Sequence, residues 1–381
     1  MARRWWSGRV ALGLLLAGGL LALVAGCSST PSRPQPGPLP AVSDTVKVSK
    51  AWTARLGELT TPLQMVTQGG RVVLASTTGL VAELDAESGR ELWRLQLKDI
   101  LHAGVGSDGR RHAVVTAGNE LVVIDAAREV WRQRLTAHTY TSPLVAGERV
   151  FVLTADRSVT AFDGATGQRL WSIQRSATDA LVLRQAGILA AVGDTLLAGN
   201  GGRLSGLQPL NGQVRWEALV GSSRGTNEVE RLVDLVAGSH RQGQTVCVRS
   251  FQTSVACIDT VRGQTLWSRP SQGHQGLDGD ESRIYGVESD SKLRAWGRRD
   301  GQLAWAEDAY RFRELSAPRV WGQVLAFGDG QGFLHLLGRD DGKTLQRQST
   351  DGSPLAAQPV VAGRILVTVN RSGLVTGWRA D

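Results

Sequence analysis

The sequence predicts an all-β protein, an eight-bladed β-propeller of four-stranded antiparallel blades. The first observation is a marker, a glycine followed four residues later by tryptophan, which recurs in full or in part at intervals of 38 to 51 residues. The second is that the segments between markers hold short apolar runs without long helical periodicity. One small sheet cannot bury both of its faces alone, so successive repeats must stack around a ring.

Eight positions carry this marker, and five of them are complete. The complete pairs are Gly89/Trp93, Gly167/Trp171, Gly212/Trp216, Gly263/Trp267 and Gly301/Trp305. In the partial markers, Trp52 lacks the glycine, Trp131 follows a turn shortened by two residues, and Gln346 replaces the tryptophan after Gly342. We expect the tryptophan, placed at the start of an outer strand, to pack between neighbouring blades.

Residues 149–171, RVFVLTADRSVTAFDGATGQRLW, show how one repeat is built. Two runs of β-branched and aromatic residues flank a polar turn, and both are too short for helices. Asp163 then ends a strand and can hydrogen-bond the backbone of the next turn. Gly167 supplies the positive φ that this turn needs. The third strand follows and begins near Trp171.

The last repeat, residues 364–381, stops before its outer strand. Residues 50–52 near the start of the domain match the missing strand. The N-terminal and C-terminal strands are therefore expected to pair in one blade and close the ring, which removes free sheet edges. The predicted propeller domain covers residues 45–381.

Residues 1–26 have the composition of a secretory signal peptide. Arg3, Arg4 and Arg9 precede an apolar run without charge, and small residues precede Cys27. The order Val24-Ala25-Gly26-Cys27 resembles the bacterial lipobox, which implies cleavage before Cys27 and lipidation of its thiol. A plain signal peptide with an unrelated cysteine is the alternative.

Residues 27–44 are expected to form a lipidated, extended tether. Five prolines lie between residues 31 and 40, a composition that disfavours folding. Ser28 after the cysteine resembles the sorting pattern of lipoproteins sent to the outer membrane. Acyl chains on one cysteine would hold the domain at the bilayer surface facing the periplasm.

The charge of the chain argues against nucleic-acid binding. The formal net charge is +8, and removal of the three arginines in the signal peptide leaves +5. No run of five or six like charges occurs, so the basic excess is spread over the surface.

Cys247 and Cys257 are the remaining cysteines, ten residues apart in one predicted hairpin. A three-residue loop, residues 251–253, would place them opposite each other, and export to an oxidising compartment would permit a disulfide. A four-residue loop would shift them out of register and leave two small core residues. Both alternatives remain open.

The sequence predicts no catalytic, cofactor-binding or metal-binding residues. The six histidines are scattered, and no nucleophile, phosphate-loop or metal-ligand motif is present. Asp278-Gly279-Asp280 resembles the start of a calcium loop but lacks the later ligands, so it is interpreted as a surface turn. The repeat A-x-D-x-x-T-G-x-x-x-W resembles quinoprotein dehydrogenases, yet their inserted loops and adjacent cysteine pair are missing. No enzymatic activity is expected.

The lipobox, the proline tether and eight such repeats together resemble the BamB family of propeller lipoproteins. Residues 180–184, ALVLR, and residues 227–234, NEVERLVD, are similar to two loops of that family. The resemblance implies contact with the periplasmic POTRA domains of BamA through Leu181, Leu183, Arg184 and Asp234. Val236 departs from the family, which has an acid at this position. Alternatively, Leu181 and Leu183 only begin an inner strand.

The resemblance implies a non-enzymatic lipoprotein that scaffolds the outer-membrane β-barrel assembly machine. Its partners would be BamA and other subunits of the machine, with unfolded outer-membrane proteins as a further candidate through strand addition. The alternatives are a quinoprotein-like enzyme or a propeller that binds cell-wall sugar or another envelope partner. Sugar binding needs exposed aromatic residues, and Trp321 alone has no explanation from the repeat.

Overall fold

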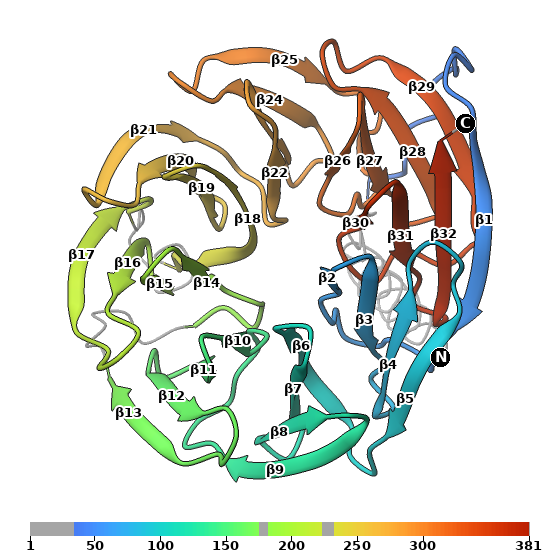
Figure 1. Ribbon diagram of the computed structural model, residues 1–381. Coiled ribbons are helices and arrows are strands. Elements are labelled where there is room, and N and C mark those ends of the chain that lie inside the picture. Colours follow the sequence, from blue (N-terminus) through green and yellow to red (C-terminus); the bar gives the residue numbers. More distant parts are fainter. Residues whose placement is uncertain (1–33, 175–181, 223–231, 381) are drawn as a thin grey trace, which may run out of the picture. The chain divides into compact units, whose positions relative to one another are not determined.

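The computed structural model describes residues 34–174, 182–222 and 232–380. Within these residues, eight four-stranded antiparallel sheets stand around a central axis (Figure 1). The prediction of an eight-bladed propeller is confirmed. No helix in the described ranges is long and apolar enough to cross a bilayer. Cys27 and Leu181 lie outside the described residues.

Blades I to VII follow the chain, each running from its innermost strand to its rim strand. Blade I holds β2 (Val66–Gln68), β3 (Arg71–Ala75), β4 (Leu80–Asp85) and β5 (Glu91–Gln96), and blade II holds β6 (Leu101–Ser107), β7 (Arg111–Thr116), β8 (Glu120–Asp125) and β9 (Arg128–Arg134). Blade III holds β10 (Leu144–Ala146), β11 (Arg149–Leu153), β12 (Val159–Asp163) and β13 (Arg169–Ile173), and blade IV holds β14 (Leu189–Val192), β15 (Thr195–Asn200), β16 (Arg203–Leu207) and β17 (Val214–Leu219). Blade V holds β18 (Leu235–Gln242), β19 (Thr245–Ser250), β20 (Ser254–Asp259) and β21 (Gln264–Pro270), and blade VI holds β22 (Leu277–Gly279), β23 (Arg283–Val287), β24 (Leu293–Gly297) and β25 (Leu303–Glu307). Blade VII holds β26 (Arg319–Trp321), β27 (Val324–Gly328), β28 (Phe333–Gly338) and β29 (Thr344–Ser349).

Blade VIII closes the ring with both ends of the domain. It contains β30 (Val360–Ala362), β31 (Ile365–Val369), β32 (Leu374–Ala380) and, as its rim strand, β1 (Val48–Arg55). β1 pairs antiparallel with β32 from Val48 opposite Ala380 to Arg55 opposite Leu374. The predicted closure is confirmed, and its consequence is that β32 has a hydrogen-bonded neighbour on each side.

The middle strands of each blade form the core. β3, for example, is buried at every position after Arg71, whereas β5 on the rim alternates between exposed and half-buried side chains. A strand that is covered on both faces is apolar throughout, and a rim strand with one wet face alternates. The core is therefore divided into clusters between blades, such as the one that contains Val72 and Val375.

Six of the seven marker tryptophans pack on the glycine of the next blade. Trp93 is the exception, because the turn of blade II has no glycine; its Nε1 donates to Glu83 and its ring lies 4.9 Å from that of His112. Trp171 of blade III lies against Gly212 of blade IV, where an added Cβ would be 2.8 Å from the indole ring. Its Nε1 donates a hydrogen bond to the carbonyl of Pro209, 3.0 Å away, in the same turn. The same indole-to-glycine contact joins Trp52 with Gly89, Trp131 with Gly167, Trp216 with Gly263, Trp267 with Gly301, and Trp305 with Gly342. The predicted packing between blades is confirmed.

The missing indole at Gln346 has a physical reason. Blade VIII receives its rim strand from the other end of the chain, so no turn joins β32 to β1 and no marker glycine faces blade VII. Gln346 instead binds the incoming N-terminal segment. Its Oε1 accepts from the backbone N–H of Val48 at 3.1 Å, and its Nε2 donates to Asp44 Oδ1 at 3.3 Å.

Trp321 also joins two blades. It lies on the inner strand β26, is 7% exposed, and donates from Nε1 to the carbonyl of Arg364 in blade VIII at 3.0 Å. The residue that the repeat left unexplained is thus a packing residue, and it offers no exposed ring for sugar binding.

The N-terminal segment packs on blade VII before β1 begins. The compact unit starts at Gly37, whereas the sequence analysis placed the propeller boundary at Thr45. Gly37 donates to the carbonyl of Arg311 at 2.9 Å and accepts from Arg313 Nη1 at 2.8 Å. Asp44 N–H donates to the carbonyl of Leu345 at 2.7 Å. Residues 37–44 of the expected tether are therefore attached to the propeller.

Candidate partner-binding site

Two connections between blades bring together the described parts, residues 182–184 and 232–234, of the loops that the family resemblance singled out. Residues 182–188 lead from blade III to β14, and residues 232–234 lead from blade IV to β18. The backbone N–H of Leu183 donates to Asp234 Oδ2 at 2.8 Å. The N–H of Ala237 donates to the carbonyl of Ala186 at 2.7 Å. Leu183, Arg184 and Asp234 therefore belong to one local surface.

Asp234 connects the segments beneath this surface. Its other carboxylate oxygen, Oδ1, lies 3.8 Å from Nη2 of Arg157, a buried side chain from the turn between β11 and β12. Its carbonyl accepts from the N–H of Phe251 in blade V at 2.8 Å. A carboxylate that binds a backbone N–H and a guanidinium fixes the loop that carries them. Asp234 thus links blades III, IV and V.

Arg184 and Leu183 differ in exposure. Arg184 is exposed, whereas Leu183 is half-buried and lines a small cavity together with Leu153 and Leu235. β14 begins only at Leu189, so Leu183 is not part of an inner strand. The alternative interpretation of Leu183 as the start of that strand is wrong. Leu181 lies in the part of the chain that is not described.

Further hydrogen bonds fix the loop behind Arg184. The Nε2 of Gln185 donates to the carbonyl of His274 in the connection from blade V to blade VI, at 2.6 Å. The N–H of Gly187 donates to Thr141 Oγ1 at 2.9 Å. Sequence reasoning missed Arg157, Gln185 and Thr141, because no motif links residues that are this far apart along the chain.

Val236, where the family has an acid, is fully buried. It pairs in register with Arg249 of β19, whose side chain is also fully buried. Nη1 of Arg249 donates to the carbonyls of Gln275 at 3.0 Å and Val287 at 2.5 Å. Burial lowers the pKa of Arg249 to about 10, while the nearby Glu288 carboxylate acts in the opposite direction. Val236 therefore cannot serve as an exposed contact.

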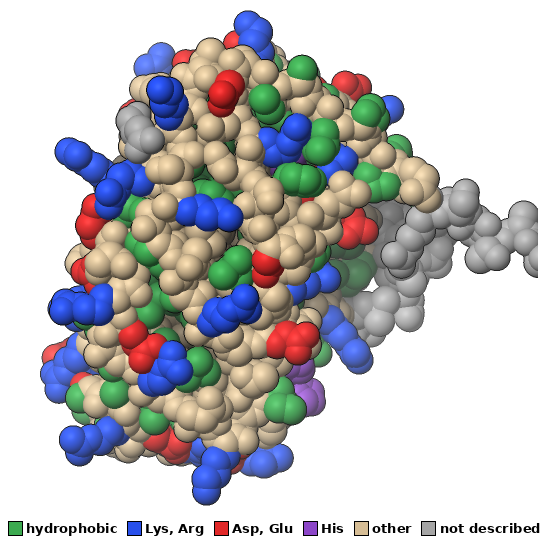
Figure 2. All heavy atoms as spheres, turned by 90° about the vertical axis from the view of Figure 1, so that its right-hand side faces the viewer, with side chains coloured by type: hydrophobic (Ala, Val, Ile, Leu, Met, Phe, Trp, Pro, Cys, Tyr) green, Lys and Arg blue, Asp and Glu red, His purple; other side chains and the backbone are tan. Residues whose placement is uncertain are grey.

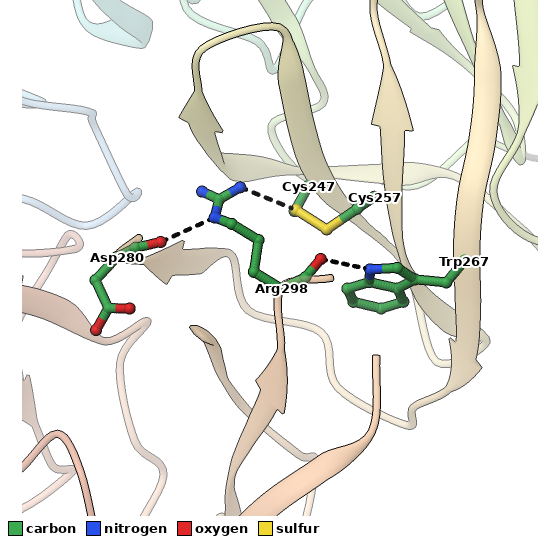
Figure 3. Close-up of a disulfide and its surroundings, with 5 residues drawn as sticks. All are labelled: Cys247, Cys257, Trp267, Asp280 and Arg298. Atoms are coloured by element: carbon green, nitrogen blue, oxygen red, sulfur yellow. Dashed lines mark hydrogen bonds between the residues drawn. A yellow bond between two sulfur atoms is a disulfide. The ribbon is translucent and has the colours of Figure 1, made fainter. Parts of the chain in front are cut away.

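Cys247 and Cys257 form a disulfide inside blade V (Figure 3). Ser250 pairs with Ser254, so the hairpin loop is residues 251–253, the three-residue alternative, and the cysteines lie directly opposite. Both are fully buried. Beside them Arg298 donates from Nε to the carbonyl of Asp280 at 2.8 Å. The disulfide thus lies in the packing of blade V against blade VI.

The centre of the ring contains a cavity of about 460 Å³ that is lined by innermost strands of five blades. Asp278 of β22 lies here and is only 4% exposed, so its interpretation as part of a surface turn is wrong. Its Oδ1 is 2.9 Å from His240 Nδ1, and its Oδ2 accepts from Arg319 Nη1 at 3.4 Å. Its sequence pattern was read as a turn because a three-residue strand leaves almost no periodic signal.

The partners of Asp278 control its ionisation. Burial disfavours the charged carboxylate, but the hydrogen bond with His240, the charge of Arg319 and the N–H of Val320 outweigh burial. They hold the pKa of Asp278 below its usual value. Through these contacts the Asp278 carboxylate connects β18, β22 and β26. Among the described residues, no group of three or more His, Cys, Asp or Glu side chains could hold a metal ion.

The fold and the linked loops define a closed eight-bladed propeller whose connections between blades III, IV and V are fixed by hydrogen bonds. A family model described as "Outer membrane protein assembly factor BamB" matches residues 49–103 and 77–307. The chain belongs to this family.

Individual proteins agree with this assignment. A curated relative from Burkholderia pseudomallei with the same description is 33% identical, and the match covers 93% of this chain and 94% of that one. The crystal structure of BamB from Moraxella catarrhalis superposes with a TM-score of 0.79 at 23% identity, covering 87% of this chain and all of that one. A quinohemoprotein alcohol dehydrogenase from Comamonas testosteroni has a TM-score of 0.66 at 12% identity, covering 88% and 77%. That last likeness concerns the fold alone.

Proposed function

We propose that this protein is a non-enzymatic assembly factor for outer-membrane proteins, which acts by presenting a rigid loop surface to a partner protein. Its membership in the BamB family supports this function. The observation that carries the proposal is the hydrogen bond from Leu183 N–H to Asp234, which fixes the backbone next to the exposed Arg184. Binding energy in interfaces concentrates in a few such well-held side chains.

The partner we propose is the POTRA region of BamA, as the family resemblance implies. Arg184 would supply a charged contact and Leu183 an apolar one, while Asp234 would act from below as a positioning residue. Because the loop is bonded to blades III, V and VI, it loses little conformational freedom on binding. Contacts with other subunits of the assembly machine would accompany this one.

We further propose that Cys27 is lipidated and anchors the protein to the outer membrane on its periplasmic side. The order of residues at positions 24–27 and the proline-rich segment after them support this anchor. Addition of unfolded barrel strands to rim strands of the propeller stays a prediction.

The test is co-purification from gently solubilised membranes. A tagged wild-type protein is compared with the double variant Leu183→Ala, Arg184→Ala, and with the control Arg203→Ala, an exposed arginine on β16 of the same blade. We expect a POTRA-containing barrel protein with wild type and control, and at least tenfold less with the double variant. Retention by all three proteins would reject this contact surface. Absence of the POTRA-containing protein from all three samples would reject the assembly-factor function and favour the sugar-binding or quinoprotein alternatives.

A further inference from the structure

The attachment of residues 37–44 shortens the part of the tether that is free to span the distance to the membrane. If Cys27 carries the lipid, as proposed above, residues 28–36 connect it to Gly37. A fully extended chain advances by at most about 3.6 Å per residue, so Gly37 lies within about 36 Å of the bilayer surface. The tether is thus a short leash with a fixed point of attachment.

This leash is shorter than the propeller is wide. A compact unit of this length has a radius of gyration of about 20 Å, which corresponds to a diameter of about 50 Å. Gly37 is bonded to the connection between blades VI and VII, and the chain then runs past blade VII into β1 of blade VIII. The chain therefore enters the ring from the side of blades VII and VIII, and blade IV lies across the ring from blade VIII (Figure 1).

The rim strand next to the leash and the residues just before it carry exposed cations and no acid. Lys47, Lys50 and Arg55 are all exposed, and residues 46–55 contain no acid. Lys47 directly precedes β1, which itself carries two cations, whereas the other rim strands that lack an acid, β13, β21 and β29, carry one each. Figure 2 shows this edge of the molecule from outside, where Lys and Arg side chains project from the face with Asp and Glu side chains between some of them.

The three cations remain available to an external anion. Within the described residues, Lys47, Lys50 and Arg55 form no ion pair, whereas the neighbouring Arg379 is paired with Glu87 at 2.6 Å. The ammonium of Lys50 lies 5.6 Å from the centroid of the Trp378 ring, which positions it without neutralising it. Exposed cations within a Debye length of an anionic lipid surface are attracted to it.

We propose that the edge formed by residues 46–55 faces the bilayer and binds the head groups of anionic phospholipids. The leash brings this edge to the membrane, and Lys47, Lys50 and Arg55 hold it there. The loop with Leu183 and Arg184, which enters blade IV, is then directed away from the lipid and toward the periplasm. This proposal rests on the lipid anchor of the proposed function. It adds how the propeller is oriented relative to the bilayer.

The charge contribution is tested without the lipid. The mature chain with Cys27→Ser is mixed with vesicles of phosphatidylcholine, with and without phosphatidylglycerol. We expect binding only to the anionic vesicles, and a loss of about 10- to 100-fold in the triple variant Lys47→Gln, Lys50→Gln, Arg55→Gln. The control is Arg203→Gln, Arg262→Gln, Arg299→Gln, which removes the same charge from exposed positions in blades IV, V and VI. Equal losses in both triple variants would overturn the proposal.

The orientation is tested with the lipidated protein in the same anionic vesicles. A fluorophore is attached at Ser49→Cys on β1 or at Gln213→Cys at the rim of blade IV, both exposed positions. A quencher on the lipid head groups should reduce the emission from position 49 several-fold more than that from position 213. Equal quenching would overturn the proposal. Because BamA is not present in either assay, failure here is independent of failure in the co-purification test.

Discussion

At the scale of single residues, the structure shows that some buried polar side chains connect neighbouring blades. In the sequence these residues stand alone and belong to no motif. Asp278 is the clearest case, because one carboxylate connects the innermost strands of blades V, VI and VII. Arg249 is a second, since its guanidinium fills space between blades V and VI next to two glycines, Gly273 and Gly286. Neither role could be predicted, because each depends on neighbours from other repeats.

The ionisation of Asp278 makes part of the stability dependent on pH. Its pKa is lowered in the folded protein relative to the usual value near 4, so its contribution is complete well above pH 4 and is lost as the pH falls toward the folded pKa. At pH 7 we expect Asp278→Asn to lower the free energy of unfolding by about 3 to 5 kcal/mol, because His240 and Arg319 lose their partner. Urea unfolding of both proteins at pH 7 and pH 3 should show this difference shrinking at pH 3. A difference that is independent of pH would contradict this account.

At the scale of elements, the turns and rim strands were predictable and the links between blades were not. Gly167, Trp171 and the strands on either side follow from local pattern, since turn geometry and burial act within one repeat. The pairing of a tryptophan with the glycine of the following blade depends on how the blades stack in the ring, so it could not be predicted from a single repeat.

The candidate site was partly predictable. The resemblance gave Leu183 and Asp234, but the hydrogen bond between them crosses 51 positions of sequence.

The contact between tryptophan and glycine can be separated from the conformation of the glycine. Gly212 has a φ of +77° and faces Trp171, whereas Gly193 has a φ of +57° and nothing within 4 Å of an added Cβ. Alanine at either position should cost about 1 to 2 kcal/mol for the left-handed backbone. Gly212→Ala should cost about 1 to 3 kcal/mol more, because the methyl group displaces the indole. Equal losses in denaturant unfolding would show that the indole contact adds nothing.

At the scale of the whole molecule, stability depends on closure of the ring. Deletion of residues 45–55 removes β1, leaves the outer edge of β32 unpaired, and removes the contact of Trp52 with Gly89. We expect the deleted protein to melt at a lower temperature and to associate through the open edge. Light scattering after gel filtration and thermal unfolding would measure both effects.

A deletion of residues 28–36 is the matched control for that experiment. It shortens the chain by a similar length but leaves every strand of the ring in place. It should therefore remain monomeric with an unchanged melting temperature. A monomeric and equally stable protein without β1 would mean that blade VIII holds together without its N-terminal strand.

Pairing of β1 with β32 also sets an order of events in time. If the chain is exported as proposed, β1 leaves the ribosome and crosses the inner membrane ahead of the other strands, while its partner β32 follows last. The backbone hydrogen-bonding groups that pair with β32 therefore stay unpaired in residues 48–55 until about 300 further residues have followed. An exposed strand that waits for its partner is vulnerable to proteases and to wrong pairing. Export chaperones and the speed of translocation should thus affect the yield of this protein more than that of a propeller closed by neighbouring strands.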